Sequence, residues 1–329
     1  MTSFSRYSLP DPLVVKVLGI GGAGVRTVDA ICRQGFRSTE CGFIDNDLQA
    51  LAKLPYRHLF PTPFVTHPAY MEDLQPNTAQ RWLKESHLNA QRAFKEIKAK
   101  VDAFLNHTDL LIVVSPQGGQ VGGLMTPVVT EHARKKGIHT VVLSSLPSPA
   151  DTYAYELAQY TRTLLNPNTV DAYHMPPLGE DAPKGQHDYA EFANDAFAQT
   201  LQSTLTVLER RAQMRLDFNA FRMLLTDGQP ATIEEGYCPL EEPRALTHAL
   251  YQMRESQRFL NTHHGWVPDT ALLYFLGDPG ITMSALRETI AGADNYALQR
   301  AVPMLGFYCG SEYQGEARFI LMTSYRPRE

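Results

Sequence analysis

Two glycine-rich segments, each lying between an apolar strand-like run and a helix-like run, constrain the fold of this chain most strongly. The first is residues 18–24 (LGIGGAG), directly after the apolar run 13–17, and the second is residues 118–123 (GGQVGG), directly after the apolar run 110–114. A glycine-rich turn from a strand into a helix presents backbone N–H groups at a helix N-terminus, where they bind phosphate. Two such turns in one domain predict a nucleotide whose phosphates are held from two sides. The predicted phosphate-binding glycines are Gly19, Gly21, Gly22 and Gly24 in the first segment and Gly118, Gly119 and Gly122 in the second.

Strand-like and helix-like segments alternate through the first half of the chain. The expected strands are 13–17, 42–44, 110–114 and 140–143, and the expected helices are 25–35, 78–105 and 127–136. Successive strand–helix units predict a parallel sheet covered by helices on both faces, with ligands at the carboxyl ends of the strands. The proline-containing segment 55–76 and the segment 166–188 are expected to be irregular.

The second half has a different pattern. A long amphipathic helix is expected over 188–211, followed by strands at 271–276, 300–309 and 316–325 and by helices at 245–260 and 282–292. We therefore expect an α/β nucleotide-binding domain over residues 1–187, with helices on both faces of its parallel sheet. A central connecting helix over 188–212 would lead to a smaller α+β domain over 213–329.

Composition excludes several classes of protein. Of the 329 residues, 43% are hydrophobic and 20% are charged, and the net charge is −5, so we expect a globular protein with no nucleic-acid partner. No run of eighteen apolar residues occurs, which predicts a cytoplasmic protein without membrane insertion. The four cysteines show no C-x-x-C spacing, so we expect four reduced thiols and no metal site.

Four motifs in a fixed order resemble the tubulin/FtsZ superfamily, as a divergent bacterial FtsZ-like protein. Residues 17–28 match the first glycine loop of that family, and residues 44–51 (IDNDLQAL) match its I-N-T-D-A-Q-A-L. Residues 193–195 match A-N-D in its central helix, and residues 216–222 match L-D-F-A-D-V-R. The resemblance runs from about residue 13 to residue 325. It implies binding of GTP or GDP, with Mg²⁺ as a candidate companion ion, and head-to-tail self-assembly into filaments.

The resemblance also assigns roles to single residues. It implies that Asn194 reads the guanine edge, that Asp45 and Asp47 lie near the nucleotide, and that Asp151 takes the place of a glutamate beside the sugar. The second glycine loop departs from the family's G-G-G-T-G-T-G. There, Gln120 and Leu124 are expected to bring side chains to positions where bare backbone would approach phosphate.

The loop after the central helix bears on catalysis. The family's pattern N-x-D-x-x-D docks onto the nucleotide of a neighbouring subunit, and the corresponding residues here are Arg215, Asp217 and Ala220. Asp217 is the one family residue that remains, and it could equally be a helix N-cap. Losing a water-positioning group typically costs about 10²–10⁴-fold in rate, so we expect weak or absent GTP hydrolysis.

Two alternatives remain open at this stage. The first is a non-polymerising pseudo-GTPase that regulates FtsZ or a membrane-remodelling system through protein partners. The second is an NAD(P)-dependent oxidoreductase, because the first loop approaches G-x-G-x-x-G and Asp45 could bind a ribose. Because the last expected strand ends close to Glu329, we also expect no recruitment by the adaptors that bind the family's usual C-terminal tail.

Overall fold

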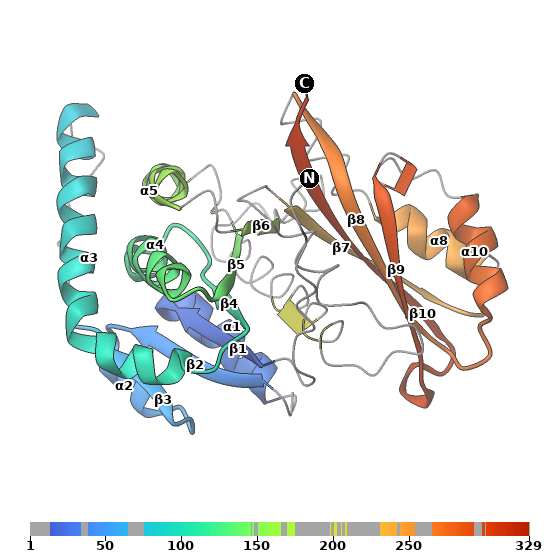
Figure 1. The fold of residues 1–329 in the computed structure, drawn as a ribbon, viewed down its shortest axis with the longest axis horizontal. Coiled ribbons are helices and arrows are strands. Elements are labelled where there is room, and N and C mark those ends of the chain that lie inside the picture. Colours follow the sequence, from blue (N-terminus) through green and yellow to red (C-terminus); the bar gives the residue numbers. More distant parts are fainter. Residues whose placement is uncertain are drawn as a thin grey trace, which may run out of the picture.

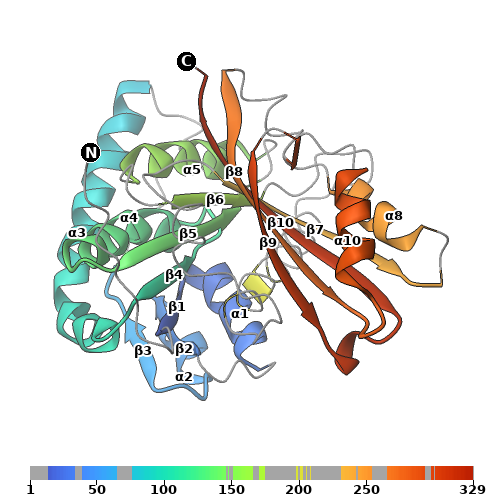
Figure 2. The ribbon, with the colours of Figure 1, turned by 45° about the vertical axis from the view of Figure 1, so that its right-hand side comes forward.

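The computed structural model describes residues 14–33, 39–64, 76–145, 147, 151–165, 170–174, 231–241, 244–253, 265–292, 298–299 and 301–328, together with positions 198, 201, 202, 205 and 208. Ten strands in this part of the chain form one sheet with the order β3-β2-β1-β4-β5-β6-β7-β10-β8-β9. Figure 2 shows the sheet passing from the N-terminal strands on the left to the C-terminal strands on the right.

The N-terminal half of the sheet is parallel throughout. Its strands are β1 (Val15–Ile20), β2 (Thr39–Asp45), β3 (His58–Pro61), β4 (Leu110–Val114), β5 (His139–Ser145) and β6 (Val170–His174). Their order, 3-2-1-4-5-6, is that of a doubly wound nucleotide-binding fold, in which the chain reverses direction across the sheet between β1 and β4. Ligands of such folds bind at that reversal point.

Helices cover both faces of this parallel half, as the sequence predicts. The helices are α1 (Gly21–Cys32), α2 (Leu48–Ala52), α3 (Pro76–Leu105), α4 (Gln120–Lys135) and α5 (Thr152–Leu164). Alternate residues of β4 enter two separate cores: Ile112 packs in the core that contains α1, and Val113 packs in the core that contains α3 and α4. Burial on both faces explains why the strands read as continuous apolar runs.

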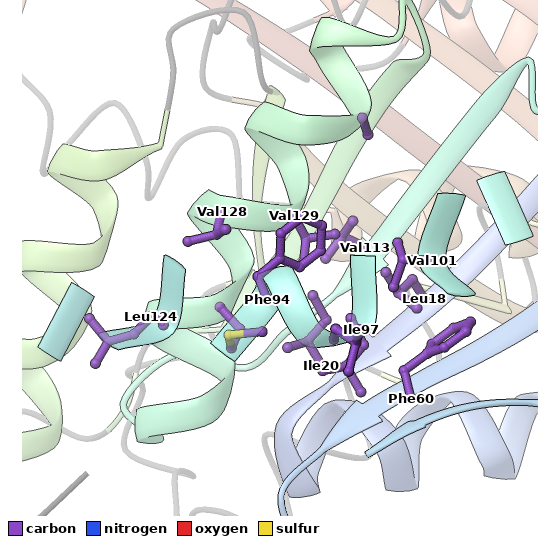
Figure 3. Packing of buried hydrophobic residues seen from close by; sticks show 14 of the residues in the cluster. Leu18, Ile20, Phe60, Phe94, Ile97, Val101, Val113, Leu124, Val128 and Val129 are labelled. Atoms are coloured by element: carbon purple, nitrogen blue, oxygen red, sulfur yellow. The ribbon is translucent and has the colours of Figure 1, made fainter. Parts of the chain in front are cut away.

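Figure 3 shows the core beneath α3 and α4, where side chains of both helices meet those of β1, β3 and β4. Phe94, Ile97 and Val101 descend from α3, and Val128 and Val129 come from α4.

The C-terminal half of the sheet is mostly antiparallel. Its strands are β7 (Ala231–Pro239), β8 (Trp266–Gly277), β9 (Val302–Cys309) and β10 (Glu316–Pro327), and a 3₁₀ turn (Ser311–Tyr313) precedes β10. Helices α8 (Ala245–Gln252) and α10 (Met283–Ala291) pack on this half of the sheet, at the end of the molecule opposite α3 (Figure 1). The two halves join where β6 pairs in parallel with β7, and within the described residues this pairing is recorded at Ala172 and Ala231. The predicted domain boundaries stay a prediction.

Part of the predicted central helix lies within the described positions. Leu201 and Leu205 are helical and buried, and they belong to the same core as α1, β8 and β10. Among the helices that the structure describes, none is both long and apolar enough to cross a lipid bilayer.

Three local expectations from the sequence are wrong. Strand β3 lies inside the segment 55–76, and β6 lies inside 166–188, although both segments were expected to be irregular. Both strands are short and have no clear local sequence pattern. They form because β3 pairs with β2 and β6 pairs with β5. Helix α4 begins at Gln120, inside the second glycine segment, because Pro127 is accommodated within the helix instead of starting it.

The expectation of four reduced cysteines is also wrong. Cys32 at the end of α1 and Cys41 in β2 form a disulfide, whereas Cys238 and Cys309 are free. The spacing of the pair matches no recognised motif. The packing of α1 over β2 brings the two residues together, and that is a tertiary contact.

We predict that the denatured, unreduced protein exposes two reactive thiols and that the reduced protein exposes four. Replacing both Cys32 and Cys41 with Ser should lower the free energy of unfolding by about 2–3 kcal/mol, because the unfolded chain loses a cross-link. Thiol titration and denaturant unfolding would measure the two effects. Cys309→Ser is the control, since it removes one thiol and leaves the disulfide in place. Four thiols before reduction would contradict the assignment.

A cluster of charges fastens α3 to α4. Asp102 of α3 accepts hydrogen bonds from Lys98 Nζ at 2.8 Å and His132 Nε2 at 2.7 Å, and it pairs with Lys136 Nζ at 2.8 Å. Burial alone would raise the pKa of Asp102, but the hydrogen bonds from Lys136, Lys98 and His132 hold that pKa well below its usual range. The carboxylate therefore stabilises the contact between the two helices.

Asp102→Asn should lower the free energy of unfolding at pH 7 by about 1–2 kcal/mol, since three charge-assisted contacts weaken in a partly exposed site. Because the pKa of Asp102 is lower in the folded state than in the unfolded chain, its carboxylate contributes stability above the pKa of the unfolded chain, about 4. That contribution is lost progressively as the pH falls toward the pKa of the folded state. The difference between variant and wild type should therefore shrink from pH 7 to pH 3. Glu85→Gln, which removes an exposed i,i+4 pair on the same helix, should change stability by less than about 0.5 kcal/mol.

Candidate nucleotide-binding site

The N-terminus of α1 carries no side-chain cap. The helix begins at Gly21 directly after β1, its N-cap residue Ile20 makes no side-chain capping hydrogen bond, and its first turn contains no acidic residue. Gly21 has a φ of +75°, a conformation that favours glycine. The first N–H groups of α1 thus lack the partners that a capping side chain would supply.

Two glycines of the first segment allow α1 to pack closely on the sheet. A Cβ placed on Gly24 would lie 2.3 Å from the carbonyl oxygen of Val114, and one placed on Gly19 would lie 2.7 Å from the carbonyl oxygen of Gly24. Both obstacles are backbone atoms, so a side chain at Gly24 would displace α1 from β4 and one at Gly19 would displace α1 from β1. The lack of a side chain at Gly19 and at Gly24 therefore allows α1 to pack closely on the strands.

The N-terminus of α4 is uncapped as well. Its N-cap residue Gly119 makes no side-chain hydrogen bond, and the first turn of α4 contains no acidic residue. The preceding Gly118 has a φ of +97°, and a Cβ on it would crowd Ala154 and Pro147. A Cβ on Gly119, by contrast, would meet nothing within 4 Å. The backbone at this helix end is therefore open.

The two uncapped helix ends touch each other. A Cβ placed on Gly21 would lie 2.7 Å from the backbone nitrogen of Gly122, and one placed on Gly122 would lie 3.3 Å from the carbonyl oxygen of Ile20. Because α1 and α4 cover opposite faces of the sheet, their N-termini meet at the carboxyl ends of β1 and β4, where the strand order reverses. Each N-terminus carries a partial positive charge, so the junction favours an anion.

The side chains of Gln120 and Leu124 leave this junction free, contrary to expectation. Gln120 Nε2 donates a hydrogen bond to the hydroxyl of Tyr153 on α5 at 2.8 Å, which holds the side chain against α5. Leu124 is fully buried in the core beneath α3 (Figure 3). The loss of glycine at these positions therefore does not fill the space between the two helix ends.

Comparisons with known proteins agree with this architecture. FtsZ 1 of Thermococcus kodakarensis is 26% identical over 241 residues, which cover 71% of this chain and 61% of that protein. An FtsZ mutant of M. jannaschii superposes with a TM-score of 0.74 at 17% identity, covering 94% of this chain and 90% of the other. CetZ2 of Haloferax volcanii, solved as a GTPγS-bound protofilament, superposes with a TM-score of 0.67 at 13% identity, covering 96% and 94%. No family model matches the chain.

In sequence and in fold, the chain is similar to members of the tubulin/FtsZ superfamily. The identity to these relatives is low, so the similarity is a divergent one, and the chain spans less than two thirds of the length of the curated relative. The predicted fold class, a parallel-sheet nucleotide-binding domain with a smaller second domain of the FtsZ type, is confirmed.

Asp45 is the predicted site carboxylate that the structure places beside the first loop. It lies at the carboxyl end of β2 and is 4% exposed, and its Oδ1 accepts a hydrogen bond from the backbone N–H of Asn46 at 2.7 Å. A Cβ placed on Gly22 would lie 3.6 Å from Asp45 Oδ2. Burial raises the pKa of Asp45 above its usual value, and the backbone N–H groups of Asn46 and Asp47 only partly offset this.

The other two predicted carboxylates cap helices. Asp47 Oδ1 accepts hydrogen bonds from the backbone N–H groups of Gln49 and Ala50 at the start of α2. Asp151 Oδ1 accepts one from Ala154 at the start of α5. These contacts give both residues a structural role, and their contact with a nucleotide stays a prediction. Asn194, Arg215, Asp217 and Ala220 lie outside the described residues.

Sequence reasoning missed two buried polar side chains at the end of β4. Ser115 is fully buried and Gln117 is 6% exposed, and in the part of the chain that the structure describes neither Ser115 Oγ nor Gln117 Oε1 has a hydrogen-bond partner. They lie beside the start of α4, where a Cβ on Gly122 would be 3.0 Å from Ser115 Oγ. The sequence signal that could have identified these two residues is their position directly after an apolar strand.

Gly24→Ala should lower the free energy of unfolding by about 1–3 kcal/mol, because the added methyl group meets a backbone oxygen that cannot move alone. Gly119→Ser adds a larger side chain to the matched helix end, yet it should change stability by no more than about 0.5 kcal/mol, since the space there is open. Denaturant unfolding without nucleotide measures both. Equal costs for the two variants would contradict the proposed packing of α1.

Proposed function

We propose that this chain is an FtsZ-like cytoskeletal protein that binds GTP or GDP between α1 and α4 and assembles head to tail into filaments. In this proposal, GTP hydrolysis is weak or absent. The contact between the two uncapped helix ends, at Gly21 and Gly122, carries the proposal. Two converging N-termini provide N–H donors and partial positive charge to one anion, which suits the phosphate chain of a nucleotide.

The kinship with FtsZ and CetZ supports guanine nucleotide over other ligands, because a CetZ2 protofilament was solved with GTPγS and a CetZ1 monomer with GDP. We infer that Asn194 recognises the guanine edge and that Asp151 lies toward the sugar. Gly22 and Gly119 would present backbone to the phosphates, since neither helix end is closed by a side-chain cap.

The residues near the first loop fit a Mg²⁺ ion that is bound together with phosphate. Within the described ranges, no cluster of three or more His, Cys, Asp or Glu could hold a metal by itself. Mg²⁺ at nucleotide sites usually takes one or two carboxylates plus phosphate oxygens, and Asp45 beside Gly22 is the carboxylate placed to serve. When bound, the ion would neutralise charge on the phosphate oxygens.

Assembly follows from the position of the nucleotide in the proposal. A head-to-tail contact that does not close into a ring produces a filament, and a nucleotide shared at that contact makes assembly depend on its binding. Arg215 and Ala220 replace two polar residues of the family's catalytic loop, so Asp217 alone would orient the attacking water. A filament that forms with GTP but releases little phosphate is the expected behaviour.

The decisive experiment is high-speed pelleting of the purified protein with GTP, GDP or no nucleotide, with phosphate release measured in the same tubes. We expect pelleting with GTP and little phosphate. A variant with Arg215→Asn and Ala220→Asp restores the family's three polar positions, and it should release phosphate about 10- to 100-fold faster because two water-positioning groups return. Asp217→Ala in that variant is the matched control and should abolish the gain.

Each remaining outcome identifies a different function. GTP binding without pelleting would contradict self-assembly and favour the pseudo-GTPase that acts through protein partners. The strand order and Asp45 at the end of β2 are shared with dinucleotide-binding enzymes. An increase in NADH fluorescence on mixing, without GTP binding, would therefore favour the oxidoreductase and overturn the proposal.

A further inference from the structure

Arg26 lies at the mouth of the first glycine loop. Side chains of an α-helix lean toward its N-terminus, so a residue covers the position four residues before it, which for Arg26 is Gly22. A Cβ placed on Gly22 would lie 3.5 Å from Arg26 Nη1. The guanidinium therefore lies over the first turn of α1, whose N–H groups point into the proposed phosphate site.

The Arg26 guanidinium has no hydrogen bond or ion pair within the described residues. Asp45 is the neighbouring charge. Burial raises the pKa of Asp45 and the positive charge of Arg26 opposes that rise, but the two side chains form no salt bridge. Arg33, at the other end of the same helix, shows the contrast: it donates two hydrogen bonds to Asp29, each 3.1 Å long. An exposed arginine without a partner at a helix N-terminus adds positive charge where the fold already favours an anion.

A second observation indicates a ligand at the same junction. Within the described residues, Ser115 Oγ and Gln117 Oε1 are buried without a hydrogen-bond partner beside the start of α4, where a Cβ on Gly122 would lie 3.0 Å from Ser115 Oγ. Buried polar atoms are nearly always paired in folded proteins, so unpaired ones mark a position that a bound group or water completes. The junction thus has a cation beside the start of α1 and unused polar atoms beside the start of α4.

We propose that the Arg26 guanidinium binds the phosphate chain of the nucleotide, an inference that rests on the proposed function above. A planar guanidinium donates paired, charge-assisted hydrogen bonds to phosphate oxygens, and Lys cannot reproduce that geometry. Arg26 would thereby anchor the phosphates to α1 while the N-terminus of α4 holds them from the other side. It is a specificity residue for phosphorylated nucleosides and takes no part in bond breaking.

The test separates the two halves of the nucleotide. Pyrophosphate and guanosine would each displace a fluorescent GTP analogue from wild-type protein and from Arg26→Ala. We expect the variant to bind GTP and pyrophosphate about 10- to 100-fold more weakly, as for a lost hydrogen bond to a charged group, and guanosine less than about twofold more weakly. Arg26→Lys should recover part of the loss.

Arg33→Ala is the matched control, because it removes an arginine from the same helix away from the site, and its affinities should equal those of the wild type. Should Arg26→Ala fail to fold, Arg26→Gln gives the same comparison with the length of the side chain largely kept. If Arg26→Ala leaves the pyrophosphate affinity unchanged, or weakens guanosine binding as much as GTP binding, the role of Arg26 is overturned and the proposed function stands. A wild-type protein that binds none of the three probes would overturn the proposed function together with it.

Discussion

The close approach of α1 and α4 at Gly21 and Gly122 is the constraint on which the rest of the structure depends. The two helices follow strands that are neighbours in the sheet, and they lie on opposite faces, so only their first turns can meet. Backbone obstacles lie 2.3 Å from a Cβ on Gly24 and 2.7 Å from one on Gly21. A side chain at Gly21 would separate the two helices, and one at Gly24 would push α1 away from β4, so either would open the junction where the strand order reverses.

That contact has an electrostatic consequence. Two helix N-termini bring like partial charges together, an arrangement that neither a capping side chain nor an acid in either first turn relieves. Arg26 adds positive charge, and Asp45, whose pKa is raised by burial, is a nearby carboxylate. A chain with a net charge of −5 thus concentrates positive potential at one point, so an anion can bind there without an overall basic surface.

The parts around the junction hold the two helices in position. Lys16 is buried in β1, donates to the carbonyl oxygens of Phe104 and Asn106 at the end of α3, and pairs with Glu40 of β2 at 2.8 Å. The Asp102 cluster then joins α3 to α4, and the disulfide joins α1 to β2. Lys16 and the disulfide connect α3 and α1 to the sheet, and the Asp102 cluster connects α4 to α3, so contacts outside the site help to fix the geometry of the two helix ends.

The sequence by itself determined the two glycine turns, the apolar strands before them, the helices on both faces and the order of motifs that resembles FtsZ. Those features are local, because backbone freedom at glycine and burial at fixed spacing are written in consecutive residues. Tertiary structure alone decided the strands at 58–61 and 170–174, the Cys32–Cys41 disulfide, and the directions of the Gln120 and Leu124 side chains. Each of these depends on a neighbour outside its own segment, and no pattern within one segment contains that information.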